Sequence, residues 1–163
     1  MKNLLVAVDF SKTTEAAVTQ AAVLARGLAA KLWILHVTSD ESQAMVYEAT
    51  QFTGYAPEFS AMPGDIQLAR DLSAEEIKRE HHELLSISSK LREDGTDAQA
   101  ILVKGETAKL IVEKAEELES EMIILGSHGH SILHKALLGS VSEAVMRHAK
   151  CNVLIVPSAK QAE

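Results

Sequence analysis

The stretch Met122-Ile-Ile-Leu-Gly-Ser-His-Gly129, completed after nine more residues by Gly139-Ser140, decides the fold of this chain. Its apolar run, 122–125, is rich in β-branched residues and suits a strand that is buried on both faces of a parallel sheet. The glycines that follow admit positive φ angles and let a ligand approach the main chain closely. The pattern therefore predicts a buried strand that ends at Gly126 and continues into a phosphate-binding loop.

A helix is predicted to begin directly after this loop. Ser140-Val-Ser-Glu143 matches a capping box, and the amides and positive dipole end of such a helix start form an anion site. The predicted phosphate donors are main-chain amides of the loop and the helix start, with two serine hydroxyls: Gly129, Gly139, Ser140, Val141 and Ser142. The simpler alternative is that the glycines only form turns and Ser140 only caps a helix.

Short apolar runs alternate with amphipathic stretches along the whole chain. Strands are predicted at 3–9, 31–37, 98–103, 122–125 and 152–156, and helices at 14–30, 73–92, 107–119 and 140–148. This alternation is typical of an α/β fold, here a single domain (1–163) with an open five-stranded parallel sheet and helices on both faces. The Rossmann-like order 3-2-1-4-5 is a common solution for such a chain, and it puts the ends of the first and fourth strands side by side.

The segment 38–71 has the least regular pattern. It contains two turn signals, Gly54-Tyr-Ala-Pro57 and Met62-Pro-Gly-Asp65. Connections of this length are uncommon unless they are lids, binding elements or mobile segments. We therefore expect a mobile, partly helical flap, with a small satellite core around its aromatic residues as the alternative. A second capping box, Ser73-Ala-Glu-Glu76, is expected to open the following helix.

Composition and charge limit the classes of function. At 163 residues the chain is long enough for one domain with its own core. Its 16 Lys+Arg and 23 Asp+Glu give a net charge of -7, which argues against general nucleic-acid or membrane-surface binding. The first apolar run reaches only about five residues before Asp9, too few for a secretory signal or a membrane span. Cys151 is alone and cannot form an internal disulfide, which fits a reducing cytoplasm.

Few side chains besides the glycine loop carry candidate chemistry. Asp9 ends the first predicted strand, and its carboxylate can accept hydrogen bonds from a ribose or a base edge; the alternative is that it caps the first helix. His128, His130 and His134 have no Cys or acid at ligand spacing in the loop, so no metal site is predicted. We expect His128 and Lys135 to neutralise phosphate. Neither a P-loop nor a Gly-x-Gly-x2-Gly motif after the first strand is present.

The signature Gly126-x2-Gly129-x9-Gly139-Ser140 resembles the nucleotide-binding signature of the universal stress protein family. The likeness extends along nearly the whole chain, through 6–11, 35–37, Gly105 and 153–156. Departures at Glu106-Thr107 and Asn152 lie outside the phosphate signature. The resemblance implies that the main chain of Val37 meets adenine, and that Leu125 and Gly126 flank the ribose and base.

The resemblance also implies a function. It suggests a regulatory stress-response protein that binds ATP or AMP, with any Mg²⁺ carried by the nucleotide, and that signals through dimerisation or an unidentified protein partner. The alternatives are a slow ATPase or phosphoryl or nucleotidyl transferase using the same cleft, and an interaction module with a vestigial loop. Efficient phosphoryl transfer needs an oriented water, a held metal and a cation aimed at the transition state. Because only candidate cations are evident, we expect any hydrolysis to be slow.

The last predicted strand, 152–156, is expected at an edge of the sheet. Its unpaired main-chain groups form a template for another chain, and neither a charge nor a proline interrupts these residues. A two-fold axis lets the same strand of each copy pair antiparallel, as the family resemblance also implies. We therefore expect a homodimer; a monomer results if the 38–71 flap covers this edge.

Overall fold

The computed structural model describes residues 2–38, 63–127 and 138–157, with the backbone alone for 63–73. Its strands are β1 (Asn3–Val8), β2 (Lys31–Thr38), β3 (Ala98–Lys104), β4 (Met122–Gly126) and β5 (Asn152–Val156). Its helices are α1 (Thr14–Leu28), α3 (Pro63–Glu93), α4 (Thr107–Glu117) and α5 (Ser140–His148). The strands form one parallel sheet in the order β3-β2-β1-β4-β5, which confirms the predicted Rossmann-like order.

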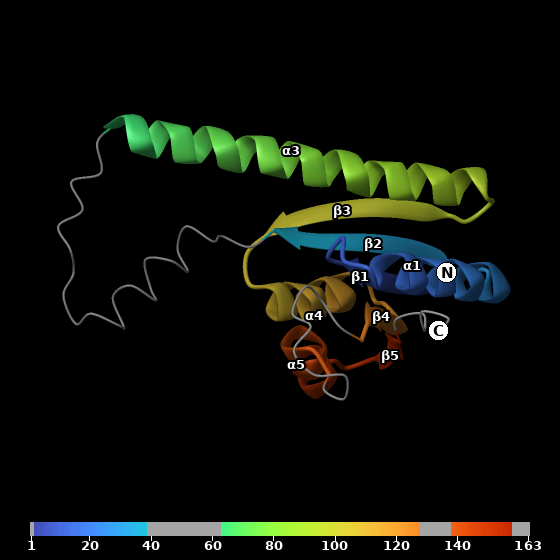
Figure 1. Ribbon diagram of the computed structural model, residues 1–163. Coiled ribbons are helices and arrows are strands. Elements are labelled where there is room, and N and C mark those ends of the chain that lie inside the picture. The colour runs from blue at the N-terminus through green and yellow to red at the C-terminus, as the bar shows by residue number, and fades with distance from the viewer. Residues whose placement is uncertain (1, 39–62, 128–137, 158–163) are drawn as a thin grey trace, which may run out of the picture.

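Helices cover both faces of the sheet, as Figure 1 shows. Alternate residues of β1 point to opposite faces, so Leu4 and Val6 belong to a core under α1 and α3, whereas Leu5 belongs to a core under α4 and α5. All three side chains are at most 1% exposed. Burying an aliphatic side chain of this size contributes about 1.5–3 kcal/mol. The central strands are therefore held from both sides, and the site at their ends rests on a rigid base.

Helix α1 packs on the sheet through small side chains. Its buried face contains Ala17, Ala21, Ala22 and Ala25, and these short residues allow the helix axis to approach the strands closely. The helix ends two residues before the predicted position because Ala29 adopts a left-handed conformation, φ 50°, and donates its N–H back to the last turn. The prediction of this helix is confirmed apart from that end.

The prediction for the start of α3 is wrong. The helix begins at Pro63 and not at Ser73, and it is 31 residues long. It lies along the sheet, and its first part extends beyond the carboxyl ends of β2 and β3 (Figure 1). Proline fits the first position of a helix, where its missing N–H has no partner to lose. The turn signal 62–65 therefore marks a helix start, and the predicted capping box 73–76 lies inside the helix. The remainder of the expected flap, 39–62, lies outside the described residues.

The carboxyl end of α3 follows the predicted glycine stop. Gly95 has φ +80°, and its N–H donates to Arg92 O at 3.0 Å while Thr96 N–H donates to Leu91 O at 2.9 Å. This arrangement satisfies carbonyl groups that the last helical turn leaves without partners. Neither α3 nor any other helix in the described ranges is both long and apolar enough to cross a membrane.

Candidate functional site

The strand order reverses between β1 and β4, and a cavity opens at the carboxyl ends of these two strands. Its volume is about 320 Å³. Reversal points of this kind are where open α/β sheets bind their ligands. The predicted site residues that line it are Asp9, Leu125, Gly126, Gly139, Ser140, Val141 and Ser142.

The structure places the other predicted residues elsewhere or does not describe them. Val37 lies in the core under α4 and α5, is 9% exposed and is not among the residues that line the cavity. His128, Gly129 and Lys135 lie outside the described residues. Of the predicted phosphate-binding residues, the structure therefore describes only those at the start of α5.

The start of α5 faces the cavity with its first turn. Helical hydrogen bonding begins with Glu143 N–H, which donates to Gly139 O at 2.9 Å. The amides of Ser140, Val141 and Ser142 precede that bond, so they have no acceptor within the helix. All three residues line the cavity. Donors of this type, together with the positive end of the helix dipole, suit an anion.

The predicted capping box at this helix start does not form. Gly139 occupies the N-cap position and no side chain caps the helix, because Ser140 is already the first helical residue. Gly139 also has φ -63° and ψ 149°, an ordinary extended conformation. The expectation of a positive φ at this glycine is therefore wrong. What remains relevant to a ligand is that Gly139 has no side chain.

The hydroxyl of Ser142 has a role that differs from the predicted one. It donates to Gly126 O at 3.2 Å, and the residue is 6% exposed. The bond connects the first turn of α5 to the end of β4, two elements that are separated by the phosphate signature. Because the hydroxyl proton is used within the protein, the main-chain amide of Ser142 is the donor that remains for a ligand.

Gly126 is required by packing against α1. A Cβ atom at this position would lie 2.8 Å from Thr13 Cβ and closer still to Thr13 Oγ1. Thr13 is itself buried, and its hydroxyl lies 2.9 Å from Ser11 Oγ. The glycine therefore allows the start of α1 to touch the end of β4. Sequence reasoning attributed this glycine to ligand approach because the partner, Thr13, is distant in sequence.

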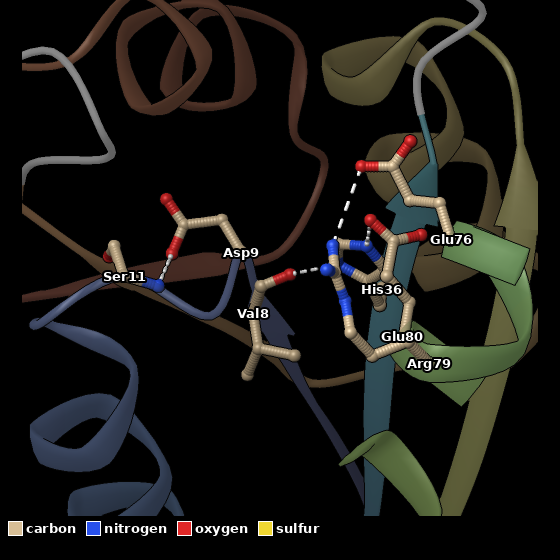
Figure 2. A network of polar contacts seen from close by, with 7 residues as sticks. All are labelled: Val8, Asp9, Ser11, His36, Glu76, Arg79 and Glu80. Carbon is tan, nitrogen blue, oxygen red and sulfur yellow. Dashed lines mark hydrogen bonds and ion pairs between the residues drawn. The ribbon is translucent and has the colours of Figure 1, made fainter. Parts of the chain in front are cut away.

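Asp9 lies opposite α5 in the loop between β1 and α1. Its Oδ1 accepts hydrogen bonds from Ser11 N–H at 3.0 Å, drawn in Figure 2, and from Thr14 Oγ1 at 3.2 Å. Asp9 therefore holds the loop before α1, but the capping alternative is wrong, because Thr13 occupies the N-cap position and no side chain caps the helix. Asp9 also lines the cavity. An ionised carboxylate has about four acceptor positions, so the two roles are compatible.

Sequence reasoning missed several residues of the cavity wall. Thr13 and Thr14 line it from α1 and its N-cap, and Thr107 and Ile111 line it from α4. The threonines follow the first and third strands within a few residues, which is the available sequence signal for a position at the carboxyl edge. Ile111 gave no such signal because it sits on the buried face of an amphipathic helix.

Comparisons with known proteins agree with this geometry. The model of the Universal stress protein family matches residues 1–157. Universal stress protein YxiE of Bacillus subtilis (strain 168) is 35% identical over 156 residues, which cover 94% of this chain and 97% of the relative. The solved structure of hypothetical protein MJ0577 has a TM-score of 0.72 at 29% identity and covers 98% of both chains.

A second solved structure, a universal stress protein in complex with cAMP, has a TM-score of 0.62 at 24% identity. It covers 97% of this chain and 98% of its own, and at this identity it supports the fold alone. The family match spans nearly the whole sequence, and the strand order, the cavity and the solved structures all agree with it. The chain therefore belongs to the universal stress protein family.

Proposed function

We propose that this protein binds an adenine nucleotide, ATP or AMP, in the cavity between β1, β4 and α5. One observation carries the proposal: the amides at the start of α5 and the carboxylate of Asp9 line the same cavity. A nucleotide needs anion donors at one end and an acceptor for its ribose or base at the other. A volume of about 320 Å³ falls at the lower end of the range for small-molecule sites. A universal stress protein of the same fold was solved in complex with cAMP, which is itself an adenine nucleotide.

The proposed pose follows from the positions of the donors. The phosphates lie on the amides of 140–142, where the missing Cβ of Gly139 leaves room for an oxygen. The ribose lies toward Asp9, and the adenine lies toward Leu125. The family resemblance adds the main chain of Val37 at the adenine, although Val37 does not line the cavity. His128, Gly129 and Lys135 complete the phosphate end, and Mg²⁺ enters only as part of the nucleotide.

The function that follows is regulatory, in the cytoplasm, through a nucleotide-responsive homodimer. β5 is an edge strand of the sheet. Its Asn152 N–H donates to Glu121 O at 3.3 Å, and its Val156 O accepts from Ser127 N–H at 2.8 Å, so both groups point toward β4. Because main-chain groups alternate in direction along a strand, those of Val153 and Ile155 point outward. They form a template for the same strand of a second copy.

Calorimetry with ATP, AMP and adenosine tests the binding proposal. Asp9→Ala should weaken all three ligands, because the ribose is common to them. Glu15→Ala is the matched control: it removes the same charge in the first turn of α1, at a residue that does not line the cavity. Wild-type protein that binds none of the three ligands, or an Asp9→Ala variant with undiminished affinity for them, would contradict the proposal.

A further inference from the structure

His36 contacts both neighbours of Asp9. It lies on β2 and is 6% exposed. Its Nδ1 is 2.7 Å from the carbonyl oxygen of Val8, the residue before Asp9. Its ring packs on the ring of Phe10, the residue after Asp9, with centroids 4.4 Å apart and planes tilted by 44°. In Figure 2 the Asp9 carboxylate points away from the imidazole, so His36 supports the loop from the side opposite the carboxylate.

Phe10 has a conformation that its surroundings must hold. Its φ of 57° is in the left-handed region, which bulky residues rarely adopt. Residues of this kind persist only where several contacts fix them, and they concentrate at functional sites. The ring contact with His36 and the packing of Phe10 against the core under α1 and α3 supply such contacts. The direction of the Asp9 side chain therefore depends on what holds His36.

The other side of the imidazole faces α3. His36 Nε2 lies 3.4 Å from Glu80 Oε1, and the Glu80 side chain is 19% exposed. Within the described part of the chain, Nε2 and Glu80 Oε2 have no hydrogen-bond partner. The carbonyl of Val8 can only accept, so Nδ1 carries a proton. The imidazole therefore reaches the main chain of β1 with Nδ1 and the side chain of Glu80 on α3 with Nε2.

We propose that His36 and Glu80 are positioning residues for the nucleotide site. The pair connects α3 to the main chain before Asp9 and to the side chain after it, and so fixes the carboxylate at the ribose end of the cavity. This inference rests on the proposed function, since it assigns the means by which that site is held. It also gives α3 an influence on ligand affinity, although none of its described side chains, 74–93, lines the cavity.

Calorimetry on the full chain, with adenosine and ATP as separate ligands, tests the pair. Glu80→Ala should weaken both ligands by the same factor, about two- to thirtyfold, the range of coupling through residues that do not touch a ligand. Glu80→Gln should recover most of the affinity, because its amide can still bridge to Nε2. Glu76→Ala should change nothing: it removes a carboxylate one turn away on α3 that pairs with exposed Arg79 (Figure 2).

The comparison of the two ligands separates positioning from a general loss of stability. Adenosine carries no phosphate, so an effect on the ribose end reaches both ligands equally. Glu80→Ala with wild-type affinity for adenosine overturns the inference, and so does a loss confined to ATP. Urea unfolding of each variant shows that binding is measured on folded protein.

A second measurement does not depend on any ligand. Ser11 N–H donates to Asp9 Oδ1, so hydrogen exchange of the Ser11 amide reports how firmly the carboxylate is held. The exchange should be faster in Glu80→Ala than in wild type, and unchanged in Glu76→Ala. If wild type binds neither ligand, the proposed function fails, and the Ser11 amide alone decides the positioning role: equal exchange in Glu80→Ala and wild type overturns it.

Discussion

Replacing Gly126 by alanine tests the packing that brings α1 against β4 beside the cavity. The new Cβ would lie 2.8 Å from Thr13 Cβ, whereas carbon atoms in favourable contact are about 3.5–4.0 Å apart. The start of α1 must therefore retreat by about 0.7 Å or more. Overpacking of this kind costs about 1–3 kcal/mol. For a domain of this length, each kcal/mol lowers Tm by about 2–4 °C.

Urea unfolding measures this effect, with a matched control in the same chain. Gly27 lies within α1 and a Cβ there meets nothing within 4 Å, so Gly27→Ala should stabilise the protein by about 0.5–1 kcal/mol. The two alanine variants should thus move the urea midpoint in opposite directions with an unchanged m value. A Gly126→Ala midpoint at or above that of wild type would show that Thr13 does not oppose a side chain at this position. Adding Thr13→Gly should recover stability beyond additivity, because it removes the opposing atoms.

Four further results are expected. Gly95→Ala should lower the free energy of unfolding in urea by about 1 kcal/mol, because φ +80° disfavours any side chain even though a Cβ at residue 95 would have open space around it. An unchanged free energy of unfolding would contradict this. Burial raises the pKa of the Cys151 thiol, so at pH 8 the native protein should react with iodoacetamide more slowly than urea-unfolded protein. The difference between the two rates should narrow as pH rises through the folded-state pKa. Equal rates at pH 8 would contradict this expectation. Ile155→Pro removes an outward N–H from β5 and should convert a dimer to a monomer in light scattering at micromolar concentration, an expectation that fails if wild type is already monomeric. ATP turnover should stay below about one per second, the lower end for kinases, and a faster rate would favour an enzyme.

The sheet and its order could be predicted because local patterns agree with the fold. The runs 122–125 and 152–156 are too short and too β-branched for helices, and the alternation with amphipathic stretches leaves few topologies. The structure begins and ends β5 at the predicted residues. Asp9 and the α5 start could also be predicted to meet, because parallel strands end at a common edge.

Other parts depend on contacts that are distant in sequence. Gly126 faces Thr13 across the sheet edge, and no local pattern indicates that this threonine needs the space. The hydroxyl of Ser142 bonds to Gly126 O, which is distant in sequence. Ser140 does not cap its helix, since the helix begins one residue earlier than the capping box implies. The early start of α3 was missed because Pro63-Gly64 is equally typical of a turn and of a first helical turn.

The most direct test of nucleotide binding between β1, β4 and α5 is a titration of the ¹⁵N-labelled full chain with AMP, followed by amide chemical shifts. We expect saturable changes that are largest at Asp9, Gly126 and 139–142. A second cavity of about 450 Å³ lies between α1 and α3, with Val18 and Ile87 in its wall, and it provides a contrast within the same spectrum. Changes centred on that second cavity, or no saturable change at all, would contradict the assignment of the nucleotide to the cavity between β1, β4 and α5.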